Sequence, residues 1–403
     1  MKVRWVLGAL AASAILLWTS CSNSSSIPAN TSLIWVAEGD QMVHTYKINQ
    51  ENGKVEPVGN DNGNPVATGV QPTQMIITPD GKTMFMVNSG GNGNAGGITA
   101  YNFHADGSLI AAGNPVSAGE TPIALALDPA GKFLFVANQG AATDVTSGTV
   151  SVFSVSGSNL NLVGAFPTET AGDSGGTGPS AVVVAPAGNY IYVANEFSNT
   201  VESLSFDGSG NLSLIAKYTA GANPSGLAFS RCAGFSSSSA NSNCTAADGD
   251  NLFVANSGSN NISIFSACIQ MLGTCTTPDG TLTEISSGSP VPAGVGPSTF
   301  LIDAIANYVY VVDRGSDDVY AYQYSPATGA LSFLGTGPGG TAVFSGGITG
   351  NVANQTTSFN WIGLSNTGVS TLSIFRVAIT GKLLPLSSGQ YALQGQPSAI
   401  LMR

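Results

Sequence analysis

The sequence predicts an all-β fold, a closed seven-bladed β-propeller with four-stranded blades, on three observations. One short element recurs seven times, with its polar residue at Glu38, Asn88, Asn138, Asn195, Asn256, Asp313 and Asn366. The gaps between these positions are 50, 50, 57, 61, 57 and 53 residues, which is the length of one propeller blade. No window has the spacing of an amphipathic helix. The third observation is that the two chain ends complement each other.

Each unit contains the same succession of signals. In the third unit, PIALALDPAG (122–131) is an apolar run that begins with proline and ends in a PxG turn. The strand KFLFVAN (132–138), a polar turn and the alternating strand TVSVFSV (149–155) follow, and an outer strand ends the unit. We letter these strands a to d from the centre outwards. The inner ones are apolar on both faces, as expected for small sheets packed between neighbours.

The chain ends predict how the propeller closes. The first unit begins at LIWVAEGD without a proline-led a strand, and the chain ends with PSAILMR (397–403), which has that pattern. We therefore expect the C-terminal strand to complete the first blade and residues 33–403 to form one closed propeller. An open solenoid or a two-sheet sandwich would explain neither the seven copies nor this match.

Composition limits the possible partners. Of 403 residues, 43% are hydrophobic, which argues against disorder. The chain has 12 Lys and Arg against 23 Asp and Glu, a formal net charge of −11. Because nucleic-acid binding requires cations that neutralise phosphates, we expect no nucleic-acid partner.

The N-terminus has the order of a secretory signal. Lys2 and Arg4 precede an apolar run, and small residues follow up to Cys21. The segment resembles a bacterial lipoprotein signal, which implies a signal peptide over 1–20, lipid on Cys21 and a tether over 21–32. An ordinary signal peptide cleaved nearby is the alternative. Either implies export, and the first implies anchoring to the cell envelope, in the periplasm or at the cell surface, with the membrane as a partner.

Four further cysteines remain in the chain. For an exported protein, an even number favours two disulfides, and proximity favours Cys232 with Cys244 and Cys268 with Cys275 over the other two connectivities. The spacing lacks CxxC and no histidine is near, so a metal site is not expected. No cofactor is expected either. Both disulfides would hold long loops of the fifth blade.

The ends of the b strands gather polar residues on one face of the propeller, together with the b-to-c loops. A small molecule or a protein could bind there. For most of the repeated Asn residues, we expect a structural role, capping the b-to-c turn by hydrogen bonds to backbone groups. The titratable candidates on this face are Glu38, Asp40, Glu120, Asp144, Asp173, Glu196, Asp313, Arg314, Asp317 and Asp318.

The repeated pattern of proline-led strand, PxG turn, [FY]VAN element and SVF-type strand resembles the lactonase-like seven-bladed propellers over residues 33–402. That family includes a 6-phosphogluconolactonase and muconate-lactonising enzymes, and the pattern is also similar to the YVTN-repeat surface propellers. The resemblance implies a pocket lined by Arg, His and Glu from a GPRH segment and a YxVNE element. Here Gly178, Pro179 and Glu196 match, but Ser180 and Ala181 stand at the Arg and His positions.

Opening a lactone requires a base and a cation or hydrogen-bond donors for the oxyanion. Both histidines, His44 and His104, lie in ordinary strand and turn patterns. Arg314 is the one arginine that follows a b strand onto this face, so Glu196 and Arg314 are the catalytic candidates, unless Arg314 pairs with Asp317 or Asp318 in its own turn. Asn195, Glu120 and Asp313 are the binding candidates.

The sequence therefore predicts an envelope-anchored binding or scaffolding propeller with an incomplete lactonase site. Two alternatives remain. One is a lactone hydrolase that resembles 6-phosphogluconolactonase and uses Glu196. The other is a purely structural surface-layer component.

Overall fold

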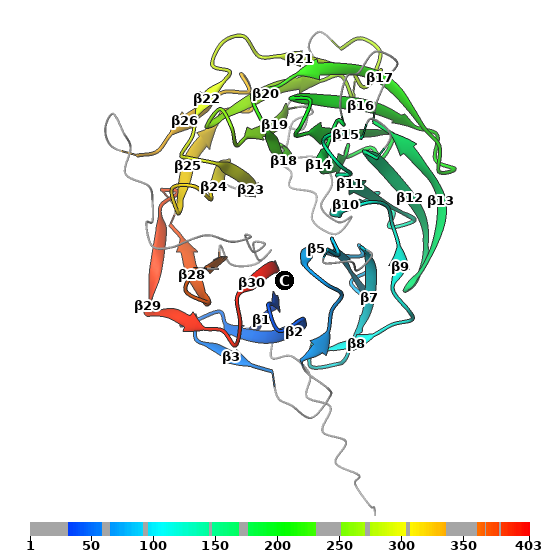
Figure 1. Ribbon diagram of the computed structural model, residues 1–403. Helices are drawn as coiled ribbons and strands as arrows, with labels where there is room; N and C mark the ends of the chain where they lie inside the picture. Colours follow the sequence, from blue (N-terminus) through cyan, green and yellow to red (C-terminus); the bar gives the residue numbers. More distant parts are fainter. Residues whose placement is uncertain are drawn as a thin grey trace, which may run out of the picture.

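The computed structural model of the chain is a ring of β-sheets around a central axis (Figure 1). The structure describes residues 31–58, 65–91, 96–144, 147–168, 176–230, 251–270, 275–303, 307–335, 361–366, 368–378 and 380–403. Cys21, Cys232, Cys244 and Asp173, together with the signal and tether segments before residue 31, lie outside these ranges. Within them there is no helix that could span a bilayer.

The strands form seven antiparallel sheets, which confirms the predicted number of blades. Blade 7 has three described strands, and its expected a strand falls in residues 336–360, outside the described ranges. From the inside outwards, the strands are β30 (Pro397–Met402), β1 (Thr31–Glu38), β2 (Met42–Asn49) and β3 (Val55–Pro57) with β4 (Val66–Ala67) in blade 1; and β5 (Pro72–Ile77), β6 (Thr83–Asn88), β7 (Gly97–Phe103) and β8 (Leu109–Ala111) with β9 (Val116–Ser117) in blade 2. In the same order, they are β10 (Pro122–Leu127), β11 (Phe133–Asn138), β12 (Thr149–Ser156) and β13 (Asn159–Pro167) in blade 3; β14 (Pro179–Val184), β15 (Tyr190–Asn195), β16 (Thr200–Phe206) and β17 (Leu212–Thr219) in blade 4; and β18 (Pro224–Phe229), β19 (Asn251–Asn256), β20 (Asn261–Ala267) and β21 (Leu282–Glu284) with β22 (Val291–Pro292) in blade 5. Blade 6 contains β23 (Pro297–Asp303), β24 (Tyr308–Asp313), β25 (Asp318–Tyr324) and β26 (Leu331–Phe333), and blade 7 contains β27 (Trp361–Asn366), β28 (Thr371–Val377) and β29 (Leu383–Ala392).

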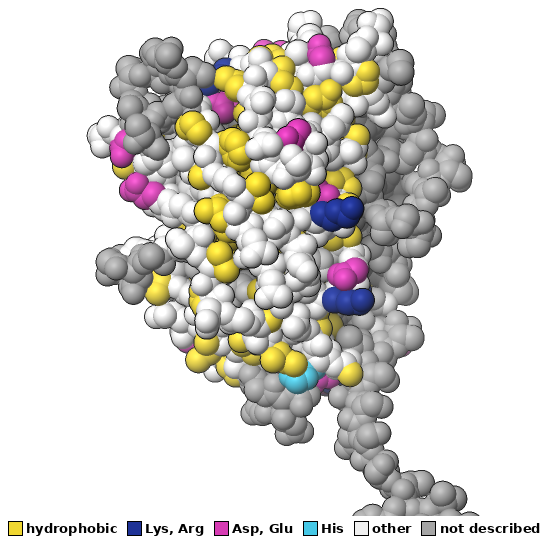
Figure 2. Space-filling view, turned by 90° about the vertical axis from the view of Figure 1, so that its right-hand side faces the viewer, with side chains coloured by type: hydrophobic (Ala, Val, Ile, Leu, Met, Phe, Trp, Pro, Cys, Tyr) yellow, Lys and Arg dark blue, Asp and Glu magenta, His cyan; other side chains and the backbone are white. Residues whose placement is uncertain are grey.

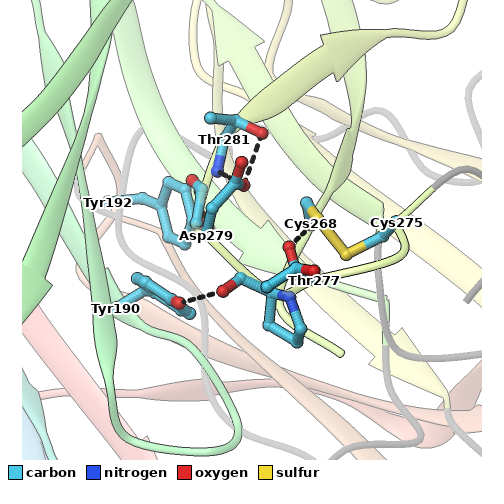
Figure 3. Close-up of a disulfide and its surroundings, with 9 residues drawn as sticks. Tyr190, Tyr192, Cys268, Cys275, Thr277, Asp279 and Thr281 are labelled. Atoms are coloured by element: carbon cyan, nitrogen blue, oxygen red, sulfur yellow. Dashed lines mark hydrogen bonds between the residues drawn. A yellow bond between two sulfur atoms is a disulfide. The ribbon is translucent and has the colours of Figure 1, made fainter. Parts of the chain in front are cut away.

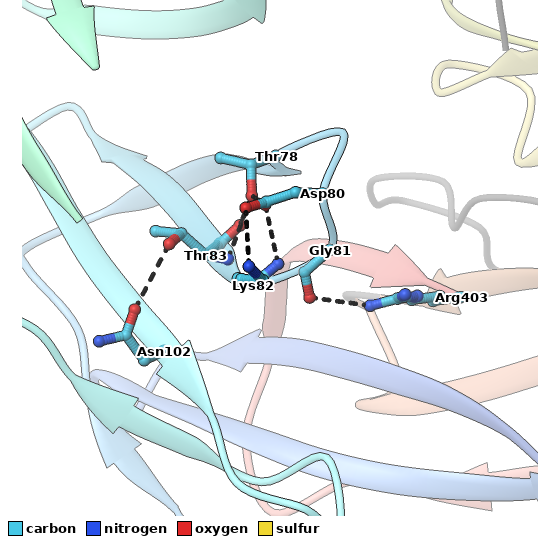
Figure 4. A network of polar contacts seen from close by, with 7 residues as sticks. All are labelled: Thr78, Asp80, Gly81, Lys82, Thr83, Asn102 and Arg403. Carbon is cyan, nitrogen blue, oxygen red and sulfur yellow. Dashed lines mark hydrogen bonds and ion pairs between the residues drawn. The ribbon is translucent and has the colours of Figure 1, made fainter. Parts of the chain in front are cut away.

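The C-terminal strand closes the ring as the sequence predicts. Strand β30 pairs antiparallel with β1, and Trp35 lies opposite Leu401 in the register. The last residue, Arg403, donates from Nη1 to the carbonyl of Gly81 in blade 2 at 3.0 Å (Figure 4). That carbonyl belongs to a PxG turn in which Asp80 accepts hydrogen bonds from the Thr78 hydroxyl and the Lys82 N–H, and these donors lower the pKa of Asp80. The chain end therefore joins the first blade to the second.

The core lies between neighbouring blades. Every described residue of the b strands β6, β19, β24 and β27 is buried, which agrees with their apolar sequences. Between blades 3 and 4, for example, Phe135 and Val152 pack with Val193 and Leu204. Because each sheet buries both faces against its neighbours, the propeller needs no helices to cover it.

Aromatic side chains of b strands also connect blades 1, 4 and 6 to a turn of the following blade. Trp35 Nε1 donates to the Gly107 carbonyl at 2.9 Å, and the Tyr310 hydroxyl donates to the Gly381 carbonyl at 2.9 Å. The Tyr192 hydroxyl makes the same contact with the Gly280 carbonyl at 2.9 Å. These bonds satisfy carbonyls of the c-to-d turns at the blade boundaries.

The c-to-d loop of blade 5 contains a disulfide between Cys268 and Cys275, with an S–S distance of 1.99 Å, which is the pairing that sequence proximity favours (Figure 3). Besides the Gly280 carbonyl, this loop offers the Pro278 carbonyl, which accepts from the Tyr190 hydroxyl of blade 4 at 3.0 Å. The disulfide thus cross-links a loop that also accepts hydrogen bonds from two tyrosines of blade 4. The other predicted pair, Cys232 and Cys244, lies outside the described residues.

Candidate functional site

One backbone arrangement recurs at the end of the propeller where the a strands begin and the b strands end. The a-strand proline lies opposite the Asn-type residue, as with Pro122 and Asn138 or Pro179 and Asn195. The residue before the proline has a positive φ in blades 2 to 6, for example 51° at Thr121 and 68° at Gly178. In this conformation the carbonyl of that same residue faces the b strand and accepts the N–H of the residue after the Asn-type position.

We call the side chains at that next position the post-Asn ring. The backbone N–H of each member donates to the residue before the proline, over 2.7 to 3.0 Å. Since the same bond fixes the backbone of every member, these residues occupy equivalent positions directly after the b strands of blades 2 to 6, which surround the central axis (Figure 1). The members are Ser89, Gln139, Glu196, Ser257 and Arg314.

The repeated Asn residues do not cap the b-to-c turn, contrary to the sequence-based expectation. Their side chains are buried and form hydrogen bonds with the neighbouring segments of the same blade instead. Asn138 Nδ2 donates to the hydroxyls of Thr149 and Ser151 on the c strand, both at 2.9 Å. In blade 5, Asn256 Oδ1 accepts the N–H of Gly221, from the segment that leads into the a strand, at 3.1 Å. The Asn256 amide therefore joins three segments of its blade, which a turn-capping side chain would not do.

Glu196 is partly buried and meets blade 3. Its Oε2 accepts a hydrogen bond of 2.8 Å from Gln139 Nε2, and its own N–H donates to the Gly178 carbonyl at 2.7 Å. In the described part of the chain, this amide is the polar partner of the carboxylate, and Arg314 is not. Sequence reasoning missed Gln139, although it occupies the same place in the preceding repeat as Glu196, and this equivalence was the available signal.

Arg314 is held on the ring by its backbone and exposes its side chain. Desolvation by surrounding protein lowers the pKa of its guanidinium, although the side chain contacts solvent. Asp318, in the same turn, accepts a hydrogen bond from the Ser316 hydroxyl at 2.8 Å.

Asp313 stands at the Asn-type position of blade 6 and has no exposed surface. Neither carboxyl oxygen has a hydrogen-bond partner in good geometry, although the nearby Gly294 N–H favours the charged form. Burial, followed by the charge of Asp318 across the strand pair, raises the pKa of Asp313 to about 8. Asp313 is thus a buried acid at a position that five of the other six blades fill with an asparagine.

The three predicted binding residues differ in how far their side chains are exposed to solvent. Asn195 and Asp313 are fully buried, so they support the frame and do not face a ligand. Glu120 is exposed, and its carbonyl accepts the Gly140 N–H beside Gln139 at 3.1 Å. Glu38, the Asn-type residue of blade 1, is also buried; it accepts from the Tyr46 hydroxyl at 2.8 Å, and burial raises its pKa.

Ser180 and Ala181 stand where the lactonase pattern has Arg and His. The Ser180 hydroxyl donates to the Pro224 carbonyl of the next blade at 2.5 Å, so it joins two inner strands. Both histidines have ordinary surroundings, as expected: His44 Nε2 lies 2.9 Å from Asp40 Oδ2, and the His104 N–H closes a turn with Ser108. Among the described residues, no three acids, histidines or cysteines are grouped to hold a metal ion.

A groove of about 410 Å³ lies on the outer side, between the edge of blade 2 and the β12–β13 hairpin of blade 3. Its lining is neutral and includes Asn114, Ser156 and Asn159. Figure 2 shows this side of the molecule, where hydrophobic side chains are scattered among uncharged ones and charged residues are few. Because the lining of the groove has no titratable group, we place the candidate site at the post-Asn ring and not in the groove.

The fold defines the protein as a seven-bladed β-propeller, and the post-Asn ring is its candidate site. The family model for the lactonase seven-bladed β-propeller matches residues 34–166 and 141–345. The chain therefore belongs to the lactonase family of seven-bladed β-propellers. No curated protein matches the sequence.

Several solved structures share the fold. A candidate 6-phosphogluconolactonase from Bacteroides fragilis superposes with a TM-score of 0.71 at 17% identity, over 93% of this chain and 98% of that one. A second from Bacteroides uniformis has a TM-score of 0.71, also at 17% identity, over 93% and 100%. The periplasmic gluconolactonase of Pseudomonas aeruginosa has a TM-score of 0.66 at 20% identity, over 92% and 99%. At these identities the similarity shows the fold alone.

Proposed function

We propose that the chain is an exported binding propeller whose ligand site is the post-Asn ring around Glu196. The observation that supports this most is the contact of Glu196 with the Gln139 amide, because the lactonase pattern implies an Arg and a His beside this acid. An acid paired in this way can accept hydrogen bonds from a ligand, and in the described part of the chain it forms no ion pair with a cation.

Ser180 supports the same proposal. A hydroxyl that donates to the Pro224 carbonyl already has its acceptor, and it provides no positive charge for a phosphate. The ligand we propose is therefore a small, neutral, hydroxyl-bearing molecule. Phosphorylated sugar lactones would meet two acids, Glu120 and Glu196, on the same part of the face.

The cellular location we propose is the envelope, with the chain anchored through lipid on Cys21. The order of charge, apolar run and small residues before that cysteine supports it. The name of the Pseudomonas aeruginosa relative, a periplasmic enzyme, and the disulfide of blade 5 agree with export. Mass spectrometry of the protein purified from membranes, with Cys21→Ser as control, tests it: an unmodified Cys21 contradicts the anchor.

Lactone hydrolysis is the second candidate, favoured by the family and by the names of the structural relatives. In that reaction the ionised Glu196 would activate water, with Arg314 the available cation of the ring. Hydrolysis of a panel of δ- and γ-lactones by residues 31–403, compared with Glu196→Gln, separates the two candidates. Turnover that disappears in the variant refutes the binding-only proposal, whereas absence of turnover together with ligand binding supports it.

A further inference from the structure

Glu196 and Gln139 occupy the same position of adjacent repeats, one on blade 4 and one on blade 3. Both backbones are fixed by the same type of bond, Glu196 to Gly178 and Gln139 to Thr121. Their side chains meet across the blade boundary at 2.8 Å, and both are partly buried. The blade boundary itself is already filled by an apolar cluster that includes Phe135 and Leu204, so packing does not require this polar pair.

We propose that Gln139 is the positioning residue for Glu196, and that the ligand site spans the boundary between blades 3 and 4. This inference rests on the proposed function and narrows its ligand class. The Gln139 amide nitrogen must face the carboxylate, because two oxygens would repel each other. That orientation fixes Glu196 Oε2 and leaves Glu196 Oε1 and Gln139 Oε1 as acceptors at the ring.

Two neighbouring acceptors are the complement of two hydroxyl donors. A polyol-like ring, such as a sugar or its unphosphorylated lactone, carries adjacent hydroxyls that can donate to both oxygens. An anionic ligand would instead face the carboxylate and the second oxygen without a donor. The pair thus selects for neutral hydroxyl-bearing ligands, and the selection depends on which blade carries the charge.

Exchanging the two residues tests this dependence. The double variant Gln139→Glu with Glu196→Gln keeps one amide and one carboxylate in contact but moves the charge to blade 3. Gln139→Leu removes the donor, and Asn211→Leu is the matched control, because Asn211 Nδ2 also donates to a carboxylate, Asp207 Oδ2 at 2.7 Å, but in the c-to-d turn of blade 4 outside the ring. The probe is 1,5-anhydroglucitol, a stable neutral analogue of a sugar lactone, with its 6-phosphate as the anionic comparison, and binding is measured by calorimetry.

We expect the exchange to keep the melting temperature of the unaltered protein and to weaken probe binding at least about tenfold, the usual effect of losing a hydrogen bond to a charged group. We expect Asn211→Leu to leave probe binding unchanged, because its contact lies outside the ring. Equal probe binding by the exchange variant and the unaltered protein overturns the inference, because the pair would then be only a contact between blades. Tighter binding of the 6-phosphate overturns the ligand class.

Crystal structures of Gln139→Leu and Asn211→Leu provide a measurement that needs no ligand. Glu196 should leave its observed conformation in the first and keep it in the second. A Glu196 side chain that stays in place without Gln139 refutes the positioning role, whatever the protein binds. If the unaltered protein binds neither probe, the proposed function and ligand class fail, while these crystal structures still decide whether Gln139 positions Glu196.

Discussion

Asp313→Asn should stabilise the protein, and the gain should grow with pH. In five other blades an Asn occupies this position, and in blade 5 Asn256 Nδ2 donates to Asn261 Oδ1 at 2.9 Å and to the Ser263 hydroxyl at 3.0 Å. In blade 6 the corresponding c-strand residues are Asp318 and Tyr320, so Asp313 faces another acid. An asparagine at 313 can donate to that acid and accept from the Gly294 N–H.

The size of the effect follows from the pKa of Asp313, which rises from 3.8 to about 8 through burial first and the charge of Asp318 second. Between these pH values the folded protein binds one more proton than the unfolded chain at this site. Stability is therefore greatest below the lower value and falls as pH rises toward the upper one. At about 1.4 kcal/mol per pH unit, the loss reaches about 4 kcal/mol at pH 7.

Urea denaturation of the unaltered protein and Asp313→Asn between pH 4 and 9 measures this loss. The free energies of unfolding should be similar near pH 4 and diverge in favour of the variant up to about pH 8. Both proteins keep the neighbouring residues Tyr320, Tyr322 and Asp318, so the comparison isolates the carboxyl group of Asp313. Asn256→Asp is the reverse control in blade 5 and should lose stability as pH rises. A difference between the unaltered protein and Asp313→Asn that does not depend on pH refutes the reasoning.

Three further predictions concern closure, the disulfide and the family site. Deleting residues 397–403 removes the buried side chains of Ile400, Leu401 and Met402, about 5 kcal/mol of burial, and should abolish the cooperative thermal transition; a retained transition would show that β30 is not needed to close blade 1. Replacing Cys268 and Cys275 by Ser should lower the free energy of unfolding by about 2 kcal/mol, because the unfolded chain regains the entropy of a seven-residue loop. The melting temperature of this variant should no longer depend on reductant. If the variant is as stable as the unaltered protein, the contacts with Tyr190 and Tyr192 alone hold the loop in place. Ser180→Arg with Ala181→His installs the residues that the lactonase pattern has here, and should raise the initial rate of glucono-1,5-lactone hydrolysis roughly a hundredfold if the frame of the site is intact; an unchanged rate would place the missing chemistry elsewhere.

The fold could be predicted because its signals repeat. Each proline, PxG turn and Asn-type residue is a weak indication alone, but seven copies at nearly constant spacing determine the strand order. The missing first strand of blade 1 then specifies the role of residues 397–403, which pair with β1 as expected. The disulfide between Cys268 and Cys275 could be predicted for a similar reason, since a short separation leaves few geometries.

The site could be predicted only in part, because contacts between blades do not follow from spacing within one. The sequence indicates that Glu196 follows a b strand, and the structure agrees. From the sequence, Arg314 two blades away was the expected partner of Glu196, because other cations could be eliminated. The partner in the structure is Gln139, an uncharged residue of the adjacent blade. The role of the repeated Asn was missed for the same reason, since its partners are side chains of the c strand and the backbone that leads into the a strand.

Blade 4 and blade 6 show how a repeated frame can acquire new chemistry at little structural cost. In both, the backbone bond that fixes the ring position is unchanged, at 2.7 Å for Glu196 and 3.0 Å for Arg314. Side chains at this position point away from the core, so a carboxylate, an amide, a guanidinium or a hydroxyl can each stand there without disturbing the strands. The neighbouring Asn-type position does not have this freedom, because Asp313 is buried and its charge destabilises the blade. Changes in ligand within this family should therefore arise at the ring, and changes in stability at the Asn-type position one residue before it.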